Sequence, residues 1–357
     1  MVFFCPSSHW NEAFPVEESN TFSDQSVTRS GRLPFATRPP AIQQGFFVRN
    51  IRPRLFHIPC LIFLTLVLFQ PGNGWAEEIS SAYPQRIVSM SPGITEILFA
   101  LGVGGRVVGV TDFCNYPEAA KAVARIGGLL NPNYEALITL QPDLIIHQPD
   151  SHKVDDFVEK LGIRGLPVSM LSLNQILNTI QTIGAATGSD EKAEQLIQKM
   201  QDEIQSYRTR LAGIPKISVL LVLGISNDSM RDIYGVGPNT YLDELLTIAG
   251  GKNLLAESQS QYPEISKEFI IHKSPEVIIE VGPARILTSE ANINRKAGWE
   301  KFSTIRAVKN NAIHFVASDY VLIPGPRLVD IIEDFARAIH PETFGSVNSL
   351  KSGVASE

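Results

Sequence analysis

The feature that most constrains this fold is a long amphipathic segment, Ser189–Leu211, which lies between two copies of one pattern. Its apolar side chains recur at steps of four and three, which places them on one helical face: Ala193, Ile197, Met200, Ile204, Tyr207 and Leu211. Ser189 is a suitable N-cap, and Gly213 and Pro215 end the pattern. The segment therefore predicts one helix of about 35 Å, close to the width of a small domain.

The sequence on the two sides of this helix repeats. Asn133–Ile146 (NYEALITLQPDLII) precedes the helix and Ser266–Ile279 (SKEFIIHKSPEVII) follows it. Each copy has an N-cap, a Glu two positions later, an apolar turn, a Pro, an acidic residue and an apolar strand. A second pair follows the same order, Thr95–Gly102 (TEILFALG) and Asp243–Gly250 (DELLTIAG). Two matches in one order predict two similar lobes joined by one helix.

Strand and helix patterns alternate along both halves of the chain. Arg86–Met90 and Ile217–Leu223 are apolar runs typical of buried strands, Ile233–Val236 is a shorter one, and each is followed by helical patterns. The alternation predicts an α/β fold of two lobes, each a mostly parallel sheet flanked by helices, joined by one long backbone helix. The predicted boundaries are 77–188 for the N-terminal lobe, 189–213 for the bridging helix, 214–342 for the C-terminal lobe and 343–357 for a tail.

The first 76 residues have the features of an export signal. Residues 48–76 contain three arginines, the apolar run Ile58–Phe69 and the small-x-small site Gly74-Trp75-Ala76. The run is shorter than the roughly 20 residues of a membrane span, so a cleaved signal peptide is favoured over a retained anchor. Residues 1–47 are predicted to be an untranslated or disordered extension. We therefore expect a soluble protein in the periplasm that begins at Glu77.

Charge and cysteine content exclude several classes of protein. The whole chain carries a net charge of −6, and residues 1–76, with six Arg and four acids, contribute +2, which leaves −8 for the rest. An acidic body of this kind disfavours nucleic acid or an anionic membrane surface as the main partner. Cys114 is the only cysteine after residue 76, so no intramolecular disulfide is predicted there.

The chain lacks the familiar catalytic motifs. GxxxxGK[ST], HExxH, GxSxG and CxxC are all missing. The closest histidine pair in the predicted lobes, His147 and His152, has no accompanying carboxylate motif. We therefore predict no catalytic residues, no metal site and no cofactor, and a protein that is not an enzyme.

The loops after the predicted strands carry the side chains best suited to binding. Open α/β sheets bind ligands at the carboxyl ends of their strands. Those loops and their neighbours provide a set of aromatic, acidic and basic groups: Tyr116, Tyr262, Asp319, Tyr320 and Arg327. Such a set suits a bulky ligand held by stacking and a few hydrogen bonds. For Tyr116 and Tyr262 the alternative is that each ring anchors its own loop to the sheet.

Glu135 and Glu268 occupy the same place in the two repeats. An acid in the first turn of a helix is favoured by the helix dipole alone. The symmetry indicates a role in binding in addition to this local effect, because the two lobes would each present one carboxylate at one end of the molecule. A two-fold partner with basic sockets could contact both.

Several segments resemble, in order, the substrate-binding proteins of ABC importers for cobalamin, haem and ferric siderophores. They span Arg86–Ile339 and comprise RIVSMSPGITEILFALG, the NYP of Asn115–Pro117, both copies of the first repeat, and SDYVLIPGPR of Ser318–Arg327. The resemblance implies a monomer that captures a corrinoid, with cobalamin as the first expectation, and delivers it to an ABC permease dimer with ATPase subunits.

The resemblance also assigns roles to residues. It implies that Tyr116, Tyr262, Asp319, Tyr320 and Arg327 contact the ligand, and that Glu135 and Glu268 dock onto arginines of the permease. The chain departs from the cobalamin binders of the family, which have Trp near Gly127-Gly128 and at Tyr262. A haem, a ferric siderophore or a metal ion therefore remains an alternative ligand. The bridging helix is expected to limit closure of the lobes to a small hinge motion.

Overall fold

The computed structural model describes residues 83–149, 152–224, 233–284 and 286–345. The predicted extension, the signal peptide with its cleavage site, and the tail beyond residue 345 lie outside these ranges. Within them, no helix combines the length and the apolar character needed to cross a membrane.

The N-terminal lobe contains a five-stranded parallel sheet in the order β3-β2-β1-β4-β5. Its strands are β1 (Ile87–Ser89), β2 (Val107–Val110), β3 (Ala124–Arg125), β4 (Leu144–His147) and β5 (Arg164–Pro167). Every residue of β1 and β4 is buried, as expected for central strands covered by helices on both faces.

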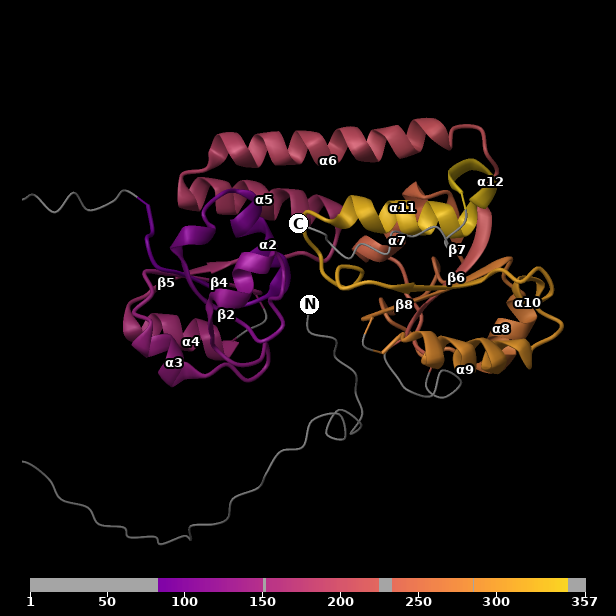
Figure 1. Ribbon diagram of the computed structural model, residues 1–357, viewed down its shortest axis with the longest axis horizontal. Coiled ribbons are helices and arrows are strands. Elements are labelled where there is room, and N and C mark those ends of the chain that lie inside the picture. Colours follow the sequence, from indigo (N-terminus) through magenta and orange to yellow (C-terminus); the bar gives the residue numbers. More distant parts are fainter. Residues whose placement is uncertain (1–82, 150–151, 225–232, 285, 346–357) are drawn as a thin grey trace, which may run out of the picture. The chain divides into compact units, whose positions relative to one another are not determined.

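Helices connect these strands and cover the sheet (Figure 1). They are α2 (Pro92–Ala100), α3 (Tyr134–Thr139), α4 (His152–Leu161) and α5 (Leu173–Thr187), with the short 3-10 helices η2 (Gly104–Arg106) and η3 (Glu118–Ala122). Three of these α-helices have a side-chain N-cap: Ser91 for α2, Asn133 for α3 and Ser172 for α5. Each cap accepts a hydrogen bond from the backbone N–H of the third residue of its helix.

The C-terminal lobe contains a four-stranded parallel sheet in the order β7-β6-β8-β9. Its strands are β6 (Ile217–Leu223), β7 (Gly251–Asn253), β8 (Val277–Gly282) and β9 (Ile313–Ala317). Its helices are α7 (Tyr241–Ile248), α8 (Lys267–Lys273), α9 (Ser289–Glu300), α10 (Arg306–Lys309), α11 (Leu328–Ile339) and α12 (Pro341–Phe344). The predicted fold class, two parallel sheets flanked by helices, is confirmed.

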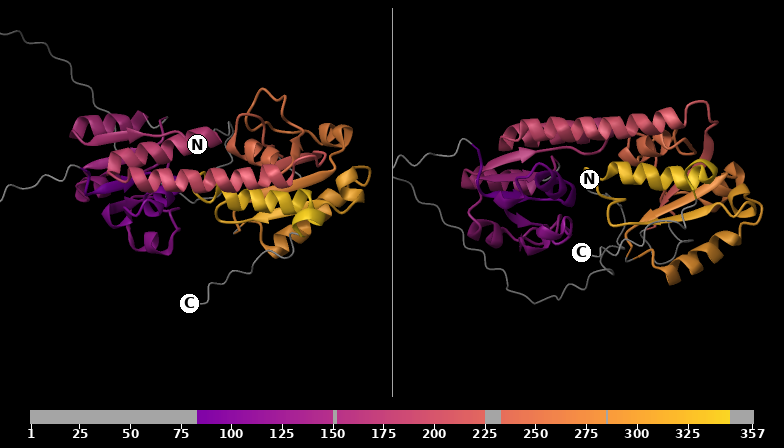
Figure 2. Two further views of the ribbon diagram at one scale, coloured as in Figure 1. Left: turned by 90° about the horizontal axis from the view of Figure 1, so that it is seen from above. Right: turned by 45° about the horizontal axis from the view of Figure 1, so that its top comes forward.

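The predicted bridging helix is α6 (Asp190–Arg210), and it packs on helices of both lobes. It contacts α5 in the N-terminal lobe and α7 and α11 in the C-terminal lobe. Seen from above, α6 extends from the magenta helices to the yellow α11 (Figure 2, left). Ala193, Met200 and Ile204 of the predicted apolar face are buried. Ser189 is the N-cap residue of α6, as predicted, but its hydroxyl bonds the Thr187 hydroxyl at 2.7 Å and caps no backbone N–H.

The sequence repeat is also a structural repeat. In α3 and α8 the caps Asn133 and Ser266 accept hydrogen bonds from the backbone N–H groups of Ala136 and Phe269, at 3.0 and 3.1 Å. Gln141 and Ser274, which follow the two helices, both adopt left-handed conformations with φ of 44°. The two lobes therefore build this unit in the same way from different side chains.

One hydrophobic core runs through both lobes. A single cluster of buried side chains includes Ile97 of α2, Ile180 of α5, Met200 of α6, Leu245 of α7 and Phe335 of α11. Smaller clusters lie on the far sides of the two sheets, around Leu137 in the N-terminal lobe and Trp299 in the C-terminal lobe. The bridging helix thus joins the lobes by shared packing.

Two local predictions differ from the structure. Ile233–Val236 is not a strand, because this segment forms only isolated bridges, Tyr234 to Glu264 and Gly235 to Val222. Conversely, α9 has no counterpart in the predicted elements. Its sequence SEANINRKAGWE has few apolar residues, and the fully buried Trp299 anchors it to the sheet.

Candidate ligand-binding site

Arg327 is the centre of the predicted site. It is the N-cap residue of α11, and its guanidinium group makes a bidentate pair with Glu96 of α2. Arg327 Nε donates to Glu96 Oε2 at 2.9 Å, and Nη2 donates to Oε1 at 2.5 Å. Because α2 belongs to the N-terminal lobe and α11 to the C-terminal lobe, this pair bonds one lobe to the other.

Burial affects both members of this pair. Burial raises the pKa of Glu96, while the hydrogen bonds and charge of Arg327 oppose that rise. Burial lowers the pKa of Arg327, but the hydrogen bonds and charge of Glu96 outweigh it, so the pKa of Arg327 is raised. A largely buried pair of this geometry is costly to break, since removing one partner leaves a desolvated charge.

Two predicted tyrosines lie against Arg327. The guanidinium carbon is 4.0 Å from the ring centroid of Tyr116 and 5.1 Å from that of Tyr320, both within the range of cation–π attraction. Tyr116 remains 49% exposed. The structure therefore brings together three of the five predicted ligand residues, with one ring held in place and still accessible.

Tyr320 is fixed from its other end. Its hydroxyl donates a hydrogen bond of 2.8 Å to Asp334 Oδ2 on α11. Burial raises the pKa of Asp334 to about 6, the bond from Tyr320 opposes the rise, and the nearby charges of Glu333 and Asp330 add to it. Asp334 thus positions Tyr320.

The remaining two predicted residues lie elsewhere on the C-terminal lobe. Tyr262 is half-buried and packs against the main core, and burial raises its pKa far above the ordinary value. This position agrees with the loop-anchor alternative for Tyr262. Asp319 is exposed just beyond the end of β9.

A groove lies beside this cluster. Its volume is about 460 Å³, within the range of small-molecule pockets. Side chains from α2, the loop after β2, α6 and the start of α11 line it, among them Glu96, Phe99, Tyr116, Lys199 and Arg327. Both lobes and the bridging helix contribute to its walls.

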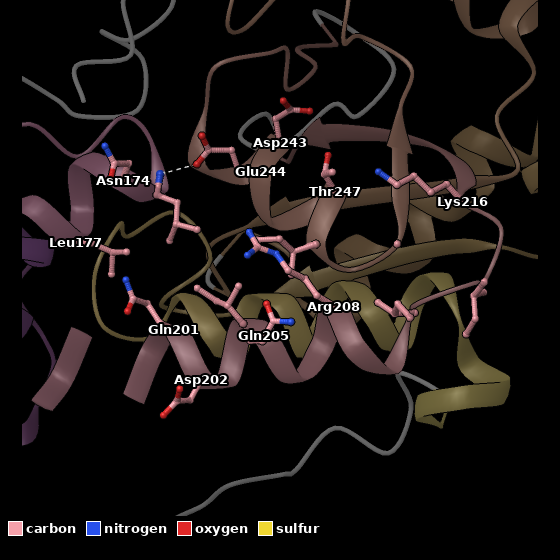
Figure 3. A pocket seen from close by; sticks show the side chains of 16 residues that line it. Asn174, Leu177, Gln201, Asp202, Gln205, Arg208, Lys216, Asp243, Glu244 and Thr247 are labelled. Carbon is pink, nitrogen blue, oxygen red and sulfur yellow. Dashed lines mark hydrogen bonds between the residues drawn. The ribbon is translucent and has the colours of Figure 1, made fainter. Parts of the chain in front are cut away.

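A second, larger groove of about 900 Å³ lies between α5, α6 and α7 (Figure 3). It is lined by polar groups such as Gln205, Arg208 and Glu244, and has no aromatic residue. Glu244 accepts a hydrogen bond of 2.5 Å from the backbone N–H of Leu173, the first residue of α5. This bond joins the lobes as well.

The two grooves have matching architecture. Glu96 and Glu244 hold the same place in the repeated segments TEILFALG and DELLTIAG. Each bonds the start of the first helix after the last strand of the other lobe, α11 after β9 and α5 after β5. The grooves are therefore two sides of one repeated junction beside α6. Sequence reasoning missed both glutamates, although their matched places in the repeat are a signal that could have found them.

The predicted docking acids are exposed on separate lobes. Glu135 and Glu268 are the second residues of α3 and α8. Hydrogen bonds from its own backbone N–H and from the Ser266 hydroxyl lower the pKa of Glu268 below its ordinary value. The two acids therefore occupy equivalent positions in α3 and α8, as the sequence repeat predicts.

No arrangement of three or more His, Cys, Asp or Glu side chains suited to a metal ion exists in the described part of the chain. His147 is buried at the end of β4, where its Nε2 lies 3.4 Å from Asp155 Oδ1. The geometry at Arg327 suits non-covalent binding through an aromatic face and fixed charges.

Comparisons with known proteins give the following similarities. The family model described as "Periplasmic binding protein" matches residues 87–320. An ABC transporter substrate-binding lipoprotein of Bacillus subtilis is 33% identical over 267 residues, which cover 73% of this chain and 82% of that protein. A vitamin B12-binding protein of Vibrio cholerae is 27% identical over 70% of this chain and 87% of its own length. A periplasmic heme-binding protein of Roseiflexus sp. RS-1, solved in apo form, matches with a TM-score of 0.61 at 26% identity, over 71% of this chain and 99% of that one.

Proposed function

Because the chain belongs to the periplasmic binding protein family, we propose that it captures a corrinoid, specifically cobalamin, and delivers it to an ABC importer. Proteins of this family work as substrate-binding components of such importers. In this proposal the chain is exported to the periplasm, loses its signal peptide after Ala76 and acts as a monomer without covalent chemistry.

The observation that carries the proposal is the exposed ring of Tyr116 above Arg327. Arg327 is held by Glu96, so the ring rests on a fixed support and needs little ordering when a flat ligand stacks on it. Stacking on a preorganised aromatic face suits a large conjugated macrocycle. The similarity to a vitamin B12-binding protein favours a corrinoid among such ligands.

Haem is the second candidate. The similarity to a periplasmic heme-binding protein favours it, and a conjugated planar ring system would use Tyr116 in the same way. The chain also departs from the cobalamin binders of the family, because it has Tyr262 where they have Trp, and this departure leaves room for a different ligand. A ferric siderophore or a metal ion would use the site less well, because each depends more on fixed charges or coordinating groups than on stacking.

In the same proposal Glu135 and Glu268 meet basic sockets on the permease dimer. Each lies in the first turn of its helix and is exposed, and the two occupy equivalent positions in the repeat. Two equivalent carboxylates suit a partner that is itself two-fold symmetric, with each ion pair fixing register as much as affinity.

Calorimetric titration of the purified protein with cobalamin, haem and a ferric siderophore tests the ligand. The wild-type protein is expected to bind cobalamin most tightly. Tyr116→Ala should weaken that binding by about 1–3 kcal/mol, roughly 5- to 150-fold, as expected for an aromatic anchor. Tyr116→Phe should bind like the wild type, because the ring remains.

Phe113 offers a matched control. It lies in the same loop as Tyr116 and is 44% exposed, but it is not among the residues that line the groove. Phe113→Ala should therefore leave the affinity unchanged. Tighter binding of haem than cobalamin would replace the first candidate with the second, and equal losses in the two alanine variants would remove Tyr116 from the site.

A further inference from the structure

We infer that the surface carrying Glu135 and Glu268 also carries two apolar contacts, Ile138 and Ile271, each of which enters an apolar depression beside a basic socket of the permease. The inference rests on the proposed function and extends it from two ion pairs to two mixed contacts. It commits to one partner, the two-fold symmetric permease dimer.

From the second to the sixth residue, the helices α3 and α8 have the same pattern of burial. Glu135 and Ile138 face outward, with the fully buried Leu137 between them in sequence. Glu268 and Ile271 face outward in the same way around the fully buried Ile270. Ile138 is 53% exposed and Ile271 is 45% exposed. Since residues three apart are neighbours on a helix surface, each lobe presents a carboxylate and an isoleucine side by side.

The sequences of the two helices agree at two positions only. The six residues of α3, YEALIT, align with KEFIIH of α8. Only the glutamate and the isoleucine are the same in both, and both of these face outward. The buried positions differ, Leu in one and Ile in the other, so packing against the sheet does not demand identical residues there. The two matched outward residues therefore form one unit that occurs once per lobe.

A single exposed isoleucine is ordinary on a protein surface. A pair placed at equivalent points of two repeated lobes, each beside an acid, matches a partner with two equivalent sockets. The ion pairs would give register and orientation, while each isoleucine would exclude water from the edge of the ion pair and strengthen it. Docking of this kind depends on salt less steeply than docking by ion pairs alone.

The test measures binding of the full chain to the detergent-solubilised permease–ATPase complex of the same organism, at low and high salt. The double variant I138S/I271S is expected to bind at least tenfold more weakly, with a steeper loss of affinity as salt rises. Its unfolding midpoint should match the wild type, because both side chains are exposed. The matched control is Ile293→Ser, since Ile293 is 70% exposed and follows Glu290 at the same spacing, but on α9, outside the repeat.

The outcomes separate the inference from the proposed function. If E135R and E268R abolish binding while I138S/I271S binds like the wild type, the isoleucine contacts are refuted and the docking acids stand. If I138S/I271S and I293S lose affinity equally, the effect is not specific to the repeat and the inference is also refuted. If the wild-type chain binds no permease complex, the proposed function fails and the inference fails with it.

Discussion

Arg327 shows how one residue can serve both the fold and the site. Its planar guanidinium group bonds both oxygens of Glu96 in the other lobe and at the same time supports the rings of Tyr116 and Tyr320. A lysine could supply the charge but neither the two parallel hydrogen bonds nor a flat surface for stacking. The position of the exposed Tyr116 ring is therefore tied to the contact between the lobes.

Asp334 gives this cluster a predicted pH dependence. Burial raises its pKa from 3.8 to about 6. A carboxyl group with a raised pKa binds its proton more tightly in the folded state. Its stabilising contribution is thus complete below pH 3.8 and is lost as the pH rises through about 6. The loss should reach about 3 kcal/mol, given 1.36 kcal/mol for each pKa unit.

Asp334→Asn isolates this contribution, because asparagine does not titrate and can still accept the hydrogen bond from Tyr320. The measurement is the free energy of unfolding in urea for both proteins between about pH 4 and pH 7. The stability of the wild type relative to the variant should fall by about 2 kcal/mol across that range, since part of the change lies below about pH 4. A difference that stays constant with pH would show that Asp334 titrates normally.

The sequence predicts which loops carry the site residues better than it predicts which side chains those residues contact. Tyr116 follows β2 of one sheet, and Tyr320 and Arg327 follow β9 of the other, so the sequence places each residue near the carboxyl end of a strand. Their meeting across the two lobes depends on how the lobes pack, which the strand pattern does not give. Glu96 was not found, because its partner lies 231 residues away and a Glu in a short helix has several local explanations. Burial and long-range pairing are properties of the packed molecule.

At the scale of elements, the close packing of α5 on α6 depends on Gly184. A Cβ atom added at Gly184 would lie 2.5 Å from the Cβ of Ala193 on α6, closer than two carbon atoms can approach. Neither side chain is long enough to move aside, so the helices would have to separate. We expect Gly184→Ala to destabilise the protein by about 1–3 kcal/mol, although alanine favours helix formation.

The double variant G184A/A193G is the control for this prediction. It moves the methyl group from α6 to α5 and restores the space between the helices. Its unfolding midpoint should recover most of the stability that Gly184→Ala loses, which is a coupling between neighbouring positions. Equal stability of Gly184→Ala and the wild type would mean that the backbones relax without cost.

Most elements could be predicted from the sequence, and the exceptions have physical causes. The apolar spacing of Ala193, Met200 and Ile204 predicts α6 because a helix that packs along one face requires it. The helix α9 lacks such a face and depends on Trp299, whose burial is set by the sheet beneath it. Ser189 has the residue type of an N-cap, but a competing bond to Thr187 takes its hydroxyl.

At the scale of the whole described body, the lobes are joined in three ways. The bridging helix α6 packs on both, the main core runs through both, and two glutamates reach across the junction in opposite directions. Glu96 of α2 bonds the residue before α11, and Glu244 of α7 bonds the first residue of α5. A junction of this kind favours the small hinge motion that the long helix leads us to expect.

The shared core predicts that the two lobes unfold together. Two natural probes can test this, because Trp299 is buried in the C-terminal lobe and Cys114 in the N-terminal lobe. The other tryptophans and cysteines of the chain are first replaced by Phe and Ser: Trp10, Trp75, Cys5 and Cys60. In urea, the midpoint of Trp299 fluorescence should coincide with the midpoint at which Cys114 becomes reactive towards a thiol reagent.

Glu96→Ala removes one partner of the buried pair, so it should lower both midpoints together, by an amount equivalent to about 3–5 kcal/mol. Separate midpoints in the parent protein would show that each lobe is stable alone and that α6 is only a tether. Separation in Glu96→Ala alone would show that the bond to Arg327, and not the shared core, makes the two lobes one cooperative unit.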